Sequence, residues 1–381
     1  MRSILSTAIA EIKFLLRNPP IIMLLSFAPI VYPFMYNSLY INKFETKLPI
    51  IVVDLDHSNQ SRELCRKLDQ AEQTSVCGVM SDLNDAQIFV SSNKANAVVV
   101  IPEGYEGNIL RGEHVNLRAW INANRFLIAV DAGKGLSESL SSIASERLIA
   151  ALEANGCTRE QARNFSQPIM LRSEGMANTL ECYGDYIIPV LLLLVLQQSL
   201  FSGAATASAG AGKHRRKFPS VAAPLIVIGR MFPYIALYSI YAALFFGFHY
   251  SLWGIPFDGS VTLLAALTVL NLCVMILAGF LLGSFCRSKL TALILTMFSS
   301  YPFLLFSGMA WPVSSMPPFW RIVSNIFPSA HYFPAAMELS RLNATFADVM
   351  PHFIALGIAF AVLMIALCVK YEMKAEPRLT G

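Results

Sequence analysis

The segment closest to a phosphate-binding motif is Gly210-Ala211-Gly212-Lys213. A loop of the type G-x-x-x-x-G-K-[ST] needs a further glycine at its start and a hydroxyl side chain after the lysine, and it joins a strand to a helix. Here Ala207 and His214 occupy those two positions, and a long apolar stretch precedes the loop. The pattern predicts that this chain binds no nucleotide.

The other residue types that carry out chemistry form no catalytic or metal-binding pattern. The six histidines are scattered along the chain, and His331 and His352 are the two that could meet, near one membrane face. Asp54 and Asp56 follow an apolar run, but the further oxygen ligands that a cation such as Ca²⁺ needs are missing. The sequence has no C-x-x-C pair. These observations predict a chain without enzyme activity, bound metal or cofactor.

Neutral polar side chains inside apolar stretches are the remaining candidates for a site. They are Tyr32, Tyr36, Gln197, Gln198, Tyr234, Tyr238 and Asn271. Such groups could line a path for an amphipathic substrate, or they could join neighbouring helices by hydrogen bonds within a membrane. The sequence leaves both interpretations open. The apolar stretches carry no charged residue, which argues against a carrier driven by protons or sodium ions.

The elements that must position these side chains are long apolar segments. Of the 381 residues, 55% are hydrophobic and 14% are charged, whereas a soluble domain has about 25% charged residues. This composition excludes a wholly soluble protein. A spanning helix needs about 20 apolar residues, and six charge-free segments are long enough: 18–42, 186–212, 231–257, 259–286, 290–320 and 349–369. We therefore expect an α-helical integral membrane protein with six transmembrane helices.

The basic residues set the expected orientation. Lys and Arg lie in the short loops on one side of the six segments, which predicts that this side and both termini are cytoplasmic. Residues 1–17 have apolar residues at helical spacing and predict an amphipathic helix on the inner membrane face. In the remaining segment, 185–381, we expect five spans and a basic cytoplasmic loop at 203–219. Residues 310–348 contain several prolines and two tryptophans, so short helices that dip into the outer leaflet are expected there.

Residues 43–184, between the first span (18–42) and the second, have a different composition. Residues 41–184 hold 14 basic and 18 acidic residues, as an ordinary soluble domain would. Apolar runs alternate with amphipathic helical patterns, which predicts an inserted extracytoplasmic α/β domain. The predicted strands are 48–53, 75–80, 97–101 and 115–121, and long helical stretches follow over 125–154 and 158–180. The sequence allows either disulfides or free thiols for the four cysteines of this domain, Cys65, Cys77, Cys157 and Cys182.

Three stretches, in this order, resemble the permease subunits of ABC-2 type exporters, in the long form with a large external domain. The first is Ile51-Val52-Val53-Asp54 with Ser58-Asn59-Gln60-Ser61. The second is Ala97–Pro102 with Gly104-Tyr105 and Leu110-Arg111-Gly112. The third comprises Ser307-Gly308, Pro312, Met316-Pro317, Asn325 and Pro328. In one place the sequence differs from the family, because the loop after the second span is small and basic where the family usually carries an acidic residue and Gly-Thr.

The resemblance implies a transport subunit of a bacterial inner membrane. Two permeases, identical or paralogous, would form a twelve-helix core, and separate ABC ATPase subunits would use ATP and Mg²⁺. The ATPases would dock on the N-terminal helix and on the 203–219 loop, where the coupling candidates are Lys213, Arg215, Arg216 and Lys217. Alternatively, these basic residues could only set the membrane topology or bind anionic lipid. The substrate would be a drug, lipid or glycolipid, the external domain could bind a periplasmic membrane-fusion adaptor, and no nucleic acid is expected.

A membrane receptor or sensor is the alternative from another functional class. Its external α/β domain would bind a ligand. No cytoplasmic segment exceeds about 20 residues, so such a receptor would lack an output domain of its own. A neighbouring ATPase gene would favour the exporter, and a neighbouring kinase gene would favour the sensor.

Overall fold

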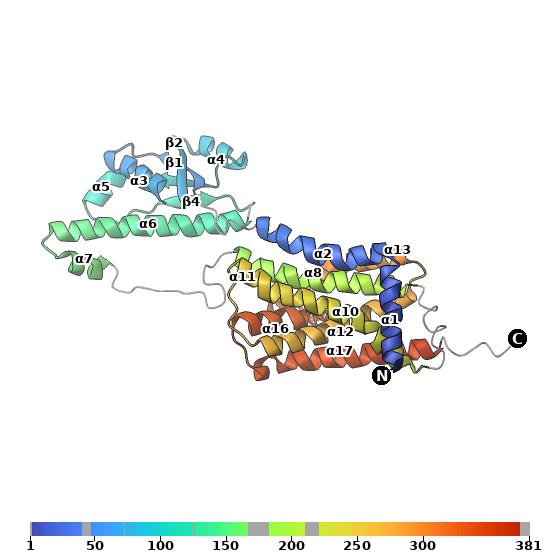
Figure 1. Cartoon of the computed structure of the whole chain (residues 1–381). Helices are drawn as coiled ribbons and strands as arrows, with labels where there is room; N and C mark the ends of the chain where they lie inside the picture. Colours follow the sequence, from blue (N-terminus) through green and yellow to red (C-terminus); the bar gives the residue numbers. More distant parts are fainter. Residues whose placement is uncertain are drawn as a thin grey trace. The chain divides into compact units, whose positions relative to one another are not determined.

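The computed structural model describes residues 2–39, 47–71, 73–124, 126–166, 183–209 and 221–373. The chain divides into two compact units (Figure 1). A helical unit comprises Met1–Ile41 and Gly175–Gly381, and a smaller unit comprises Asn42–Glu174. The basic residues 213–217, Cys182 and most of the predicted helix 158–180 lie outside the described residues.

The helical unit contains the long apolar helices. In chain order its elements are α1 (Arg2–Leu16), α2 (Pro19–Leu39), α8 (Tyr183–Ser208), α10 (Ala223–Ala243), the π-helix η1 (Leu244–His249), α11 (Tyr250–Leu252), α12 (Val261–Phe285), α13 (Lys289–Phe298), α14 (Ser300–Leu305), the 3₁₀ turn η2 (Val313–Ser315), α15 (Pro318–Ser324), α16 (Ser329–Arg341) and α17 (Phe346–Met373). Within the described residues, five helices are long and apolar enough to cross a membrane: α2, α8, the continuous α10–η1–α11 helix, α12 and α17. The chain is therefore a multi-pass membrane protein.

The predicted span within 290–320 takes a different form. Two short helices, α13 and α14, lie there, and Ser299 separates them. Pro302 has no backbone N–H for the carbonyl group four residues earlier, which is that of Phe298, the last residue of α13. At the same point, Ser299 Oγ donates to the Thr296 carbonyl oxygen, three residues earlier, at 2.6 Å. The predicted number of six spans therefore requires that α13 and α14 together cross the membrane.

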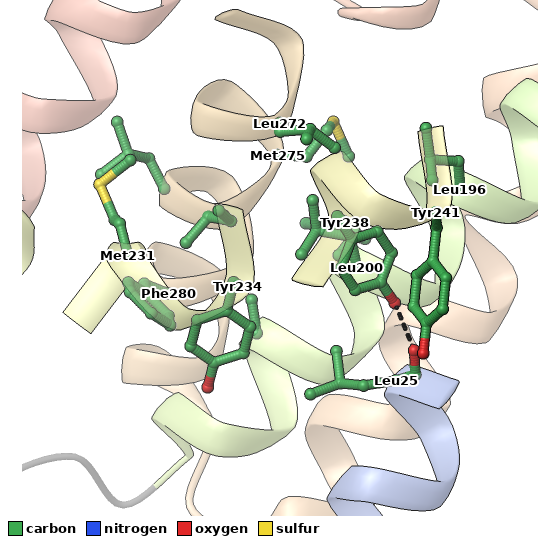
Figure 2. Packing of buried hydrophobic residues seen from close by; sticks show 14 of the residues in the cluster. Leu25, Leu196, Leu200, Met231, Tyr234, Tyr238, Tyr241, Leu272, Met275 and Phe280 are labelled. Atoms are coloured by element: carbon green, nitrogen blue, oxygen red, sulfur yellow. Dashed lines mark hydrogen bonds between the residues drawn. The ribbon is translucent and has the colours of Figure 1, made fainter. Parts of the chain in front are cut away.

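Glycine and serine positions explain how the long helices begin and how closely they pack. Ser260 precedes α12 and its hydroxyl accepts from Leu263 N at 3.4 Å, which satisfies a backbone donor at the helix start. Gly279 on α12 lies so near α8 that a β-carbon there would be 2.8 Å from the Phe201 carbonyl oxygen. Small residues allow such backbone approach between membrane helices. Tyr234, Tyr238 and Phe280 belong to the apolar core that these helices enclose (Figure 2).

The smaller unit is built on a four-stranded sheet of order β2-β1-β3-β4. The strands are β1 (Leu48–Asp54), β2 (Thr74–Met80), β3 (Ala97–Ile101) and β4 (Arg118–Ile121). Pairs β1–β2 and β1–β3 are parallel, and β3–β4 is antiparallel. Strand β1 is central and buried on both faces, as its unbroken apolar run indicates.

Helices of the smaller unit follow their local capping signals. They are α3 (Asn59–Gln70), α4 (Leu83–Ser91), α5 (Tyr105–Leu110), α6 (Phe126–Ala154) and α7 (Arg159–Ser166). Ser58 caps α3 by accepting from Ser61 N at 3.1 Å, and Asp82 caps α4 by accepting from Asn84 N at 2.7 Å.

Two details of the smaller unit refine the sequence predictions. Strand β4 begins at Arg118 rather than at 115, although Val115 and Leu117 still pack against the core and so keep the alternating pattern. Cys65, Cys77 and Cys157 are free thiols.

Candidate functional site

A buried ion pair joins the first helix of the chain to α10. Arg230 Nε donates to Glu11 Oε2 at 3.0 Å, and Arg230 Nη2 donates to Glu11 Oε1 at 3.2 Å. Both side chains are completely buried. A paired, bidentate geometry of this kind is what allows a guanidinium and a carboxylate to leave solvent together.

Three aromatic side chains complete this site. The Tyr234 hydroxyl donates to Glu11 Oε1 at 3.0 Å, Arg230 Nη1 hydrogen-bonds the Tyr371 hydroxyl, and the Phe280 ring centroid lies 4.3 Å from Arg230 Cζ. We call these five residues the Arg230 cluster. It connects α1, α10, α12 and α17.

Sequence reasoning missed this cluster, because the charge-free window begins at 231 and Arg230 precedes it by one residue. Helix α10 begins at Ala223, so Arg230 lies about two turns inside a candidate span. The charge-free windows carry no charge, as stated, but the helices extend beyond them, so α10 contains Arg230 and α8 contains the buried Asp185.

The neutral polar candidates occupy separate contacts rather than one site. The Tyr238 hydroxyl donates to the Leu25 carbonyl oxygen at 3.1 Å and lies 3.0 Å from Ser199 Oγ, so α10 meets α2 and α8 there (Figure 2). Tyr234 belongs to the Arg230 cluster. The rings of Tyr32 and Tyr36, both on α2, are 5.9 Å apart.

The two adjacent glutamines of α8 differ in their surroundings. Gln198 Nε2 donates to the Thr296 carbonyl oxygen and so joins α8 to α13. Gln197 is fully buried, and neither polar atom of its amide has a hydrogen-bond partner among the described residues. The same is true of Asn271 on α12, the helix that packs along α8. Unsatisfied buried amides are costly, so these two positions need an explanation beyond packing.

An apolar groove of about 520 Å³ lies between the α10–η1–α11 helix and α12. Small and aromatic side chains line it, among them Ala243, Phe246, Phe257 and Ala265. Its volume is in the range of small-molecule sites. Next to it, His249 on η1 contacts Asn37 on α2 through Nε2. Single π-turns inside α-helices often mark functional positions.

The polar contacts of residues 310–348 hold short helices in place. Arg321 Nη2 donates to the carbonyl oxygens of Ser314 and Met316, at 2.8 and 3.2 Å. Arg341 Nη1 donates to the Asp185 carbonyl oxygen on α8 at 2.5 Å. The rings of His331 and His352 do meet, with centroids 5.7 Å apart. Among the residues that the structure describes, no three His, Cys, Asp or Glu side chains are grouped as metal ligands.

The coupling candidates Lys213, Arg215, Arg216 and Lys217 lie outside the described residues, so their placement stays a prediction.

Comparison with known proteins agrees with the arrangement of apolar helices. The family model described as "ABC-2 family transporter protein" matches residues 20–369. A comparison with curated proteins found no significant match. The family match covers most of the chain, from α2 to α17, and it confirms the resemblance to ABC-2 permeases, while the long form with a large external domain stays a prediction. The chain therefore belongs to the ABC-2 transporter family, as a membrane permease component of an ABC transporter.

Proposed function

We propose that this chain is the permease subunit of an ATP-driven ABC exporter that moves an amphipathic substrate, such as a drug, lipid or glycolipid, out of the cytoplasm or the inner leaflet. The observation that carries the proposal is the family match over residues 20–369, on a chain whose described residues contain five helices able to span a membrane. In this proposal α13 and α14 together form a further span, which gives six, with both termini in the cytoplasm of a bacterium. Residues 43–184 then lie outside the inner membrane.

The energy for transport would come from separate ABC ATPase subunits, since the sequence has no complete phosphate-binding loop. They would dock on α1 and on the basic 203–219 loop. A second permease, identical or paralogous, would complete the core. An α/β unit outside the membrane is suited to binding a periplasmic adaptor.

An amphipathic substrate is supported by the mixture of surfaces in the helical unit. Gln197 and Asn271 carry buried amide groups that have no hydrogen-bond partner among the residues that the structure describes. The groove beside α12 offers apolar surface. A substrate with a polar head and an apolar body could use both kinds of contact when the helices move apart.

The first experiment is purification of the tagged chain from its native membranes in a mild detergent, followed by identification of partners and an assay of ATP hydrolysis. We expect an associated ATPase, and ATP-dependent movement of amphipathic probes after reconstitution into vesicles. A chain that remains alone after crosslinking, without ATPase, would overturn the exporter and favour the receptor.

The basic loop gives a second test of the same proposal. Reversing Arg215, Arg216 and Lys217 to Glu should reduce transport per ATP hydrolysed, because an acidic ATPase surface would no longer be attracted. Reversal of Lys374 and Arg378, near the C-terminus, provides a control on the same membrane face. Unchanged coupling in the loop variant, with unchanged topology, would exclude the loop as an ATPase contact.

A further inference from the structure

We infer that Arg230 is a positioning residue that fastens α1 to the membrane spans, so that any displacement of α1 moves α10 and α17 with it. The part of this inference that concerns transport depends on the proposed function, in which the ATPases dock on α1. The attachment itself does not depend on it.

Helix α1 has two chemically different faces. Its inward face carries Thr7, Ala8 and Glu11, which are almost completely buried. Its outward face carries a stripe of large apolar side chains, of which Leu5 is 63% and Leu16 is 67% exposed. This helix turns a charge and small residues towards the protein and its apolar stripe away from it. Burial of large apolar side chains on the inward face therefore contributes little along its first three turns.

Close backbone contact and an ion pair hold α1 against α10 in place of apolar burial. A β-carbon at Gly229 would lie 2.7 Å from Thr7 Cβ and 2.8 Å from the Ile4 carbonyl oxygen, so the two helices touch through their backbones. Glu11 and Arg230 form their bidentate pair one turn further along α1. At the end of α1, Phe14 and Leu15 add apolar contact with the core.

The guanidinium of Arg230 contacts three other helices at the same time. Its Nε and Nη2 atoms bind α1, its Nη1 atom binds Tyr371 on α17, and its flat face lies over Phe280 on α12. A planar fork can make these contacts at once, whereas the single ammonium group of lysine cannot. Separation of Glu11 from Arg230 would leave buried charges unpaired, so the helices are expected to move together.

The test compares Arg230→Lys and Glu11→Gln with Lys13→Gln, an exposed charge on the same helix. The full chain, with any ATPase that purifies with it, is examined by hydrogen–deuterium exchange and by transport per ATP hydrolysed. We expect amide exchange in α1 to accelerate at least tenfold in the first two variants, with α12 unchanged, and transport per ATP to fall at least tenfold. Lys13→Gln should leave amide exchange in α1 unchanged; because α1 is the proposed docking element of the ATPase, this control is applied to exchange alone.

A purely structural role would reduce the amount of folded protein but leave transport per ATP unchanged in the folded fraction. If a single variant fails to fold, the neutral pair Glu11→Gln with Arg230→Gln takes its place, because it leaves no lone buried charge. Unchanged exchange in α1 would overturn the attachment. Faster exchange with unchanged transport per ATP would overturn the transmission. If the wild-type chain has no ATPase, the proposed function fails, and the exchange of α1 alone then decides the attachment.

Discussion

Gly283 on α12 lies so close to α8 that a β-carbon at this position would be 2.0 Å from the Ala205 carbonyl oxygen. Gly279, one turn earlier, approaches the same helix. The two helices are therefore in backbone contact over at least one turn. In a membrane, where lipid is as apolar as leucine, such close approach is a main source of helix association.

The first prediction follows from this contact. Gly283→Ala should destabilise the chain by about 1–3 kcal/mol through overpacking, which outweighs the gain in helix propensity of about 1 kcal/mol. The measurement is the thermal unfolding temperature of the purified chain in detergent. Gly357→Ala on α17 is the matched control, because a β-carbon there meets nothing within 4 Å, and it should not destabilise. Equal stabilisation by both substitutions would contradict the backbone contact.

The second prediction separates the two interpretations of Tyr238. Its hydroxyl joins α10 to the Leu25 carbonyl oxygen and to Ser199, so Tyr238→Phe should lower the free energy of unfolding by about 1 kcal/mol. Tyr32→Phe is the control. Because Tyr32 is partly exposed, this substitution should change the free energy of unfolding little. If Tyr238 also lies on the substrate path, the folded Phe variant will show an altered KM for transport. An unaltered KM together with unaltered stability would exclude both roles.

The third prediction concerns the end of β1 in the smaller unit. Asp54 is buried, and its carboxylate accepts from Asp56 N at 3.1 Å, from His57 N at 3.0 Å and from Ser61 Oγ at 2.6 Å. Asp54→Ala should destabilise this unit by about 2 kcal/mol or more, because hydrogen bonds to a charged group are lost and their donors remain.

Hydrogen–deuterium exchange of residues 48–71 in the full chain would measure this effect. Glu103→Ala, at an exposed position of the same unit, should leave the exchange unchanged. Exchange in the Asp54 variant that matches the wild type would show that the carboxylate does not hold this turn together.

The fourth prediction is a pH dependence of Cys65. Burial, and secondarily the charge of Asp54, raises the pKa of the Cys65 thiol from its ordinary 9.0 to about 11. The folded state therefore favours the neutral thiol. Its contribution to stability is fully present below pH 9 and is lost as the pH rises from 9 to about 11.

Alkylation rates would test this pKa. Because the thiolate is the reactive form, Cys65 at pH 8 should react about 100-fold more slowly than a thiol of ordinary pKa, before access is considered. Denaturant should remove the difference. Cys157 is less buried and serves as the control within the same chain. Equally fast alkylation of Cys65 and Cys157 in the folded chain would contradict a raised pKa.

The parts of the structure that the sequence predicted well are those with local causes. The run Leu48–Val53 has no polar interruption and predicts a strand, and the structure places that strand, β1, in the centre of the sheet. The caps of α3 and α4, Ser58 and Asp82, were not predicted, but they too act within four residues of the helix start.

The parts that the sequence did not predict depend on distant partners. Nothing near Glu11 in the sequence indicates that its partner is Arg230, 219 residues away. A charge-free window also ends at any charged residue. Arg230, which lies inside α10, is therefore assigned to the loop before the span. The unsatisfied amides of Gln197 and Asn271 could be predicted as polar groups in a span, but their lack of partners depends on the packing of α8 against α12.

The distance between Glu11 and Arg230 along the chain also has a consequence for biogenesis. At about 5–20 residues per second, the ribosome makes Arg230 about 10–40 s after Glu11. In that interval α2 and the whole Asn42–Glu174 unit are synthesised, while the carboxylate waits without its guanidinium. The hydrogen bonds of the Arg230 cluster can therefore be complete only after Tyr371, near the end of α17, has been made. Helix α1 is thus synthesised 219 residues before the residue that pairs with its buried carboxylate.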